Sequence, residues 1–196
     1  MLKLKMLLGA VVLSTLSGCA HQIVIAPDVA KINPTTAQVS SHHIGYVISD
    51  ADRVKQVITP GGGGDKVSYT PYKDIEPALF KVLSNSFARA YPIKSATDAD
   101  AIKQNNISYV FIPELTTNSS STSLVTWPPT DFTIDLNSKI VDSATNAVVW
   151  QKHLSAHGQS EFKEFVHDLS LTGKRASLQL MNDLQAALDA SPELHK

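Results

Sequence analysis

Two segments of alternating apolar and polar residues, joined by a turn, restrict the fold of this chain more than any other feature. Apolar and polar residues alternate along 132–140 and again along 148–154. Successive side chains of a β-strand point to opposite faces, so each segment predicts a strand with one buried and one wet face. Residues 142–146 between them are of types typical of turns. The sequence therefore predicts a β-hairpin over 132–154.

Apolar residues at helical spacing predict three helices. The first has Asp74 as its N-cap and ends before Pro92, and the second covers 97–105. The third begins near residue 170 and stops before Pro192. Residues between these helices supply the remaining strands.

Two short runs of β-forming residues, 44–48 and 107–112, predict further strands. The second run is apolar on both faces, which is typical of a strand at the centre of a sheet. The element order predicts an α+β fold with two layers, in which a mixed, largely antiparallel sheet carries helices on one face. The opposite face would be wet and would hold a row of polar side chains: Thr133, Asp135, Asn137, Lys139, Gln151 and His153.

The N-terminus has the pattern of an export signal. Lys3 and Lys5 precede an apolar run over 6–13, and small or polar residues lead to the single cysteine, Cys19. The apolar run is too short to span a bilayer, which takes about 20 residues. One interpretation is an ordinary secretory signal in which the cysteine is incidental.

The sequence Leu-Ser-Gly-Cys over 16–19 also resembles the lipobox of bacterial lipoproteins. The resemblance implies cleavage between Gly18 and Cys19, attachment of diacylglycerol to the Cys19 thiol and acylation of the new amino group. Two or three acyl chains would hold the protein firmly, whereas one binds only marginally. Because residue 20 is Ala rather than Asp, the resemblance also implies sorting to the periplasmic face of the outer membrane.

These patterns predict four segments. Residues 1–18 would be the signal peptide, 19–40 a lipidated flexible tether, 41–191 a periplasmic α/β domain and 192–196 a C-terminal tail. The tether prediction depends on its prolines and its lack of sustained periodicity.

The domain resembles one that recurs in envelope lipoproteins. The strand at 107–112, the segment 132–144 with its Asp turn, and Val-Val-Trp at 148–150 carry the resemblance. The family includes YajG-like, curli-secretion and penicillin-binding-protein-activator lipoproteins and part of the periplasmic Tol protein. It implies an assembly or regulatory role without a shared catalytic site.

The charge balance gives no indication of a nucleic-acid partner. The chain has 17 Lys and Arg against 18 Asp and Glu, and removal of residues 1–18 would leave 15 basic residues and all 18 acidic ones. Nucleic-acid-binding domains usually show a basic stripe. With one cysteine, the chain can form no internal disulfide, so its stability must come from its core.

No motif predicts catalysis. Gly61 to Lys66 is not a phosphate loop, because Asp65 separates the glycines from the lysine; a flexible loop is the better interpretation. His153 and His157 would lie about 13 Å apart on one strand face, at about 3.3 Å per residue. That is too far for one zinc ion with bonds of about 2 Å. We therefore predict no metal, no cofactor and no enzymatic activity.

Trp127, Pro128 and Pro129 form the most notable loop feature. A large amphipathic ring on a stiff loop is typical of an interface hot spot, so these residues are a candidate partner contact. Equally, Trp127 could fold back and cover an edge of the core.

The sequence thus predicts a non-enzymatic binding or assembly accessory protein, anchored to the outer membrane through Cys19, with an envelope protein as partner. Two alternatives stay open. One is a lipid-tethered hydrolase or metal-binding enzyme that uses His153 or His157 beside Asp135. The other is a lipid or glycolipid transport factor, which would need an apolar cavity between sheet and helices.

Overall fold

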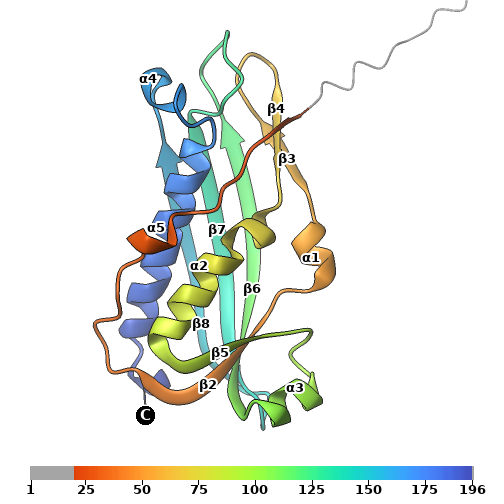
Figure 1. Ribbon diagram of the computed structural model, residues 1–196, viewed down its shortest axis with the longest axis vertical. Helices are drawn as coiled ribbons and strands as arrows, with labels where there is room; N and C mark the ends of the chain where they lie inside the picture. The colour runs from red at the N-terminus through yellow and green to blue at the C-terminus, as the bar shows by residue number, and fades with distance from the viewer. Residues whose placement is uncertain (1–19, 196) are drawn as a thin grey trace, which may run out of the picture.

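A twisted five-stranded sheet forms the centre of the protein in the computed structural model, which describes residues 20–195 (Figure 1). The strand order is β5-β2-β6-β7-β8. The strands are β2 (Ser40–Val47), β5 (Phe87–Ile93), β6 (Ile107–Ser120), β7 (Asp131–Asp142) and β8 (Val148–Gln159). The neighbours β5, β2 and β6 are parallel, whereas β6, β7 and β8 form two long antiparallel ladders. The mixed α+β architecture is as predicted.

A smaller sheet of order β1-β4-β3 lies beside the far half of β6. Its strands are β1 (His21–Gln22), β3 (Val57–Pro60) and β4 (Lys66–Tyr69). It is joined to β6 by a buried hydroxyl contact of 2.6 Å between Thr59 and Ser119. The Tyr69 hydroxyl also donates to Thr117 Oγ1. This sheet was not predicted from the sequence.

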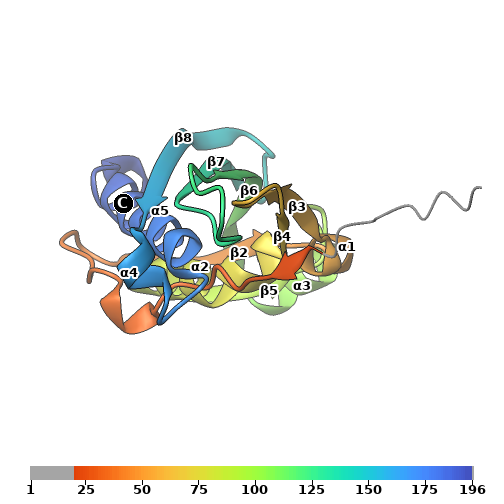
Figure 2. The same ribbon diagram turned by 90° about the horizontal axis from the view of Figure 1, so that it is seen from above.

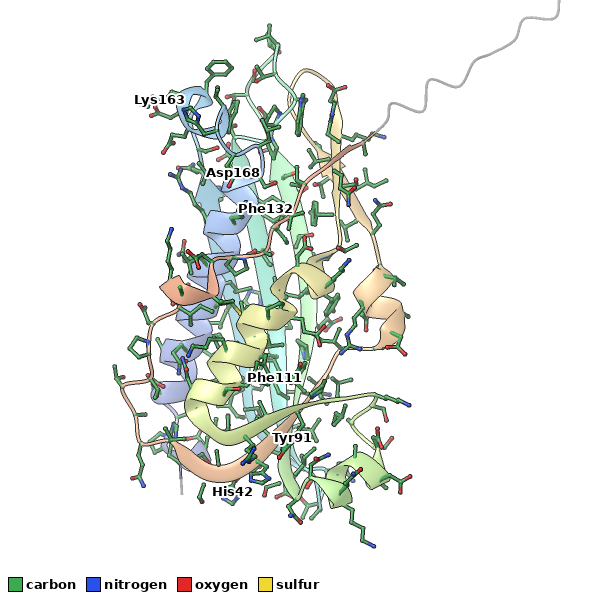
Figure 3. The ribbon with its side chains drawn as sticks, in the orientation of Figure 1. His42, Tyr91, Phe111, Phe132, Lys163 and Asp168 are labelled. Carbon is green, nitrogen blue, oxygen red and sulfur yellow. The ribbon has the colours of Figure 1, made fainter. Side chains whose placement is uncertain are left out.

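Helices α2 (Pro71–Ser86) and α5 (Leu171–Asp189) cover one face of β6–β8, as Figure 2 shows from above. Phe111 and Phe132 lie between these helices and the sheet, and both are fully buried (Figure 3). The hairpin is confirmed, since β7 and β8 pair with Leu136 opposite Leu154. These alternating residues therefore build the main core.

Five short helical segments complete the described chain. They are α1 (Asp50–Val54), α3 (Ala99–Gln104), α4 (Phe162–Phe165) and the 3-10 helix η1 (Val29–Lys31), with a second 3-10 helix, η2 (Pro192–Leu194), at the C-terminal end. α3 begins at Asp98, whose carboxylate accepts the N–H of Ala101. It lies on the opposite sheet face, where Ile102 packs against a small cluster containing Val110 and Val141. The apolar residues of 107–112 are therefore covered on both faces of the sheet. β6 is the central strand, as predicted.

The first long helix ends earlier than predicted. It begins at Pro71 and stops at Ser86, where Phe87 adopts an extended conformation and starts β5. The apolar residues of 87–93 fit a helix or a strand locally, and the parallel pairing of β5 with β2 decides for the strand. Asp74 is therefore not the N-cap but lies in the first turn.

The prediction of a flexible tether over 19–40 is wrong for the residues that the structure describes. Ile23 and Ile25 are 2% and 0% exposed and belong to the main core. The N–H of Ile25 donates to Asp74 Oδ2 at 3.0 Å, and Thr36 donates to Asp189. Burial raises the pKa of the Asp74 carboxyl, and the hydrogen bond from Ile25 opposes that rise. The segment 20–40 is part of the domain because it covers α2 and α5.

The predicted tail at 192–196 is also wrong over 192–195. Leu194 is fully buried, and the indole N–H of Trp150 donates to Ser191 Oγ at 2.8 Å. The C-terminal residues therefore close the end of the core between β8 and α5.

Candidate functional site

The face of β6–β8 opposite α2 and α5 is polar along most of its length. We call this surface the polar face; it comprises Glu114, Thr116, Asn118, Thr133, Asp135, Asn137, Lys139, Gln151, His153, Ser155 and His157, all exposed or partly exposed. The strand register places them in adjacent rows, with Asn137 between Glu114 and His153. All six residues predicted for the wet face lie here. The residues of opposite parity lie on the side of the helices, where Thr117 and Ser119 of β6 contact the small sheet.

The two histidines of this face lie apart and in the open. His153 Nδ1 is 2.8 Å from Asn137 Oδ1, and its Nε2 is 3.9 Å from Asp135. His157 Nε2 is 3.3 Å from Asp131 instead. Both side chains are about half exposed, and across residues 20–195 no three His, Cys, Asp or Glu side chains are placed to hold a metal ion. Both histidines are thus open to solvent on this face.

Three segments meet at one end of the molecule, which we call the loop end (Figure 1). They are the turn 61–65 between β3 and β4, the loop 121–130 between β6 and β7, and α4. The N–H of Gly62 donates to the Trp127 carbonyl and that of Gly63 to the Ser123 carbonyl, both at 2.8 Å. These bonds join the first two segments into one unit.

The run of four glycines is therefore not the flexible loop that was predicted. A Cβ atom on Gly62 would lie 2.0 Å from the Thr126 carbonyl oxygen. Glycine is needed because the two backbones approach so closely, and Gly63 and Gly64 also have positive φ. The four consecutive glycines are visible in the sequence. Their contact with the loop 121–130 is not, because that loop is distant in sequence.

Trp127 lies against the folded chain rather than standing free. Its ring stacks on the ring of His21 with centroids 4.2 Å apart, and it packs against the main core. Pro128 and Pro129 are buried, and the Pro129 carbonyl accepts a hydrogen bond from Thr172. Of the two interpretations of this loop, the geometry favours the one in which Trp127 covers an edge of the core.

The exposed large apolar residues of the loop lie shortly before this motif. Leu124 and Val125 are each 90% exposed, although the sequence analysis singled out neither. The available signal was a pair of adjacent apolar residues within a stretch of Ser and Thr.

Helix α4 forms the other side of the loop end and is fixed by an ion pair. Arg175 on α5 donates to Glu164 at 2.7 Å and to the Gln159 carbonyl at 2.6 Å. Hydrogen bonding from Arg175 lowers the pKa of Glu164 to about 2, so this carboxyl is ionised at physiological pH. A cleft of about 660 Å³ separates α4 from the loop 121–130. Lys163 marks α4 in Figure 3.

The predicted lipidation and cleavage residues, Gly18 and Cys19, lie outside the described residues, as does the signal peptide 1–18. The described residues begin at Ala20, directly before β1. None of the helices within residues 20–195 is long and apolar enough to cross a membrane.

The chain is similar to several solved bacterial structures. A Xanthomonas campestris protein of the family DUF330 has a TM-score of 0.52 at 15% identity, with 89% of this chain and 97% of that chain covered. The PelC dodecamer from Paraburkholderia phytofirmans has a TM-score of 0.48 at 13% identity, covering 81% and 94%. A minor lipoprotein from Acinetobacter baumannii has a TM-score of 0.39 at 10% identity, covering 77% and 91%.

No protein-family model and no curated protein matches the chain by sequence. The similarity to the Xanthomonas protein shows a shared fold. The set of similar structures includes bacterial lipoproteins.

Proposed function

We propose that this protein is a lipid-anchored accessory component of the bacterial outer membrane, which binds an envelope protein through its polar face and catalyses no reaction. The observation that carries the binding role is the polar face itself, an ordered set of polar side chains that neither α2 nor α5 covers. Open antiparallel faces of this kind are common binding surfaces. The lipobox at 16–19 supports the anchor.

The two alternative functions have less support. A hydrolase would need His153 and Asp135 to line an enclosed pocket. His153 Nε2 and Asp135 Oδ1 are 3.9 Å apart, but both side chains lie on an open strand face. A lipid-transport factor would need a cavity between sheet and helices, and that space is filled by Phe111, Phe132 and Leu184, all fully buried. The proposal includes a relationship to the YajG-like and curli-secretion lipoproteins. The observed α+β fold agrees with that relationship.

Photocross-linking from the polar face tests the proposal. A photoreactive phenylalanine analogue replaces Asn137, at the centre of the face, in the full-length protein within intact cells. We expect a discrete cross-linked protein product, because a bound partner would cover this exposed position. The product is detected by gel shift and identified by mass spectrometry.

The matched control places the same analogue at Phe80, which is exposed on the outer side of α2. We expect product from position 137 to exceed that from position 80 several-fold. Equal yields from both positions would contradict the assignment of the polar face, since random encounters label both surfaces alike.

A further inference from the structure

Leu124 and Val125 are the most exposed of the large apolar side chains in the part of the chain that the structure describes. Single exposed apolar residues are ordinary on protein surfaces and need no explanation. Two adjacent ones at the tip of a loop are a small apolar projection, and such projections mark contacts with proteins or membranes. The residues around Leu124 and Val125 indicate whether the contact is with a protein or with a membrane.

The loop holds these two side chains in a defined position. Ser123 Oγ accepts hydrogen bonds from the Thr126 N–H at 3.1 Å and from the Thr126 hydroxyl at 2.6 Å. The Ser123 carbonyl accepts the N–H of Gly63 from the neighbouring turn. The tip is therefore supported from within and from the side, with both apolar side chains left outside.

The described chain begins close to the loop end. His21 pairs with Val67 in the small sheet and stacks on Trp127, three residues from Leu124 in sequence. Cys19 is two residues before His21, so their Cα atoms are at most about 7 Å apart, at about 3.3–3.6 Å per residue. Acyl chains on Cys19 would enter the bilayer beside the loop end, which then has to face the membrane.

Helix α4 adds apolar surface across the cleft from the tip. Phe162 and Val166 are 61% and 55% exposed there, and Phe162 lines the cleft together with Thr122 and Thr126. Charged groups nearby lie in pairs of opposite sign, with Lys163 3.1 Å from Glu161. Arg175 likewise lies 2.7 Å from Glu164. The loop end thus suits an apolar contact more than attraction to anionic lipid.

We propose that the loop end rests on the bilayer and that Leu124 and Val125 enter its interfacial region. This inference rests on the proposed anchoring through Cys19 and adds a second, non-covalent contact that fixes the orientation of the domain. In this orientation β6–β8 run roughly perpendicular to the membrane plane, so the polar face is accessible from the side (Figure 1). A neighbouring envelope protein can then reach it.

A fluorescent probe at the tip tests this orientation. Cys19 is the only cysteine, so the acylated chain has no free thiol and Leu124→Cys introduces a single one. The lipidated full-length variant is labelled with a polarity-sensitive dye and reconstituted into vesicles of phosphatidylethanolamine and phosphatidylglycerol. Lipids with a spin label near the head group serve as quenchers. Asn137→Cys on the polar face and Asp100→Cys on α3 are matched controls, since both positions are exposed and lie away from the loop end.

We expect the dye at position 124 to shift its emission to the blue and to be quenched several-fold more than at positions 137 and 100. Val125→Cys should give the same result and guards against a local effect of one substitution. Equal, weak quenching at all positions on vesicle-bound protein would overturn the orientation while leaving the anchor intact. Labelling of the unaltered chain, together with failure to bind vesicles, would overturn the anchor and the orientation with it.

Discussion

Ile25→Ala should lower the free energy of unfolding by about 2–5 kcal/mol, the range for deleting a fully buried aliphatic side chain. Ile25 is 0% exposed and packs against Gly173 of α5, where a Cβ atom would lie 2.4 Å from its Cγ2. Alanine would leave a cavity between the N-terminal segment and the helices. Urea denaturation of residues 19–196, with Cys19 replaced by Ser to prevent oxidation, measures the change.

Val24→Ala is the matched control for this prediction. Val24 is the adjacent β-branched residue and is 47% exposed, so its truncation should change stability by about 0.5 kcal/mol or less. If Ile25→Ala cost as little as Val24→Ala, the segment would not be docked and the tether interpretation would be right after all.

Gly158→Ala should destabilise the protein by about 3 kcal/mol, the upper part of the usual range for overpacking. The added Cβ would lie 2.0 Å from the Thr172 carbonyl oxygen and 2.6 Å from the Ala176 nitrogen. Both are backbone atoms of α5, so the clash can be relieved only by moving the helix from β8. Thermal unfolding followed by circular dichroism measures the loss.

Gly64→Asn is a suitable comparison, because no atom lies within 4 Å of the position that its Cβ would take. Its φ of 85° is one that Asn tolerates better than other residues, so the cost should be small. A Gly158→Ala protein as stable as this variant would mean that β8 and α5 are not in close contact.

Some elements could be predicted because the periodicity of their own residues determines their secondary structure. The hairpin follows from alternation along 132–140 and 148–154, and α5 follows from helical spacing that begins near residue 170. The central position of β6 also followed, because apolar side chains on both faces require cover on both faces.

Elements that depend on distant partners were not predictable in this way. β5 is a strand because β2 lies beside it, and residues 20–40 pack on the domain because Ile25 contacts Asp74 and Gly173. Neither relation leaves a periodic signal in the sequence.

The two candidate sites differ in the same way, since one depends on local periodicity and the other on contacts between distant segments. Strand alternation predicted six residues of the polar face, all in β7 and β8, whereas its β6 residues lie beyond the strand predicted at 107–112. The loop end was not predictable, because it is assembled from three segments far apart in sequence. The residue type of Trp127 predicted a partner contact, but Trp127 stacks on His21, and Leu124 and Val125 are the exposed pair.

The central claim is that lipid on Cys19 holds this domain at the membrane, and mass spectrometry of the N-terminal peptide tests it most directly. The full-length protein and its Cys19→Ser variant are expressed in a Gram-negative host, and the envelope is fractionated. We expect the wild-type peptide to begin at Cys19 and to carry a diacylglycerol and an amide-linked acyl chain. We expect the variant to lack both the modification and the cleavage after Gly18. A Cys19→Ser protein that is normally processed and still bound to the outer membrane would contradict the account.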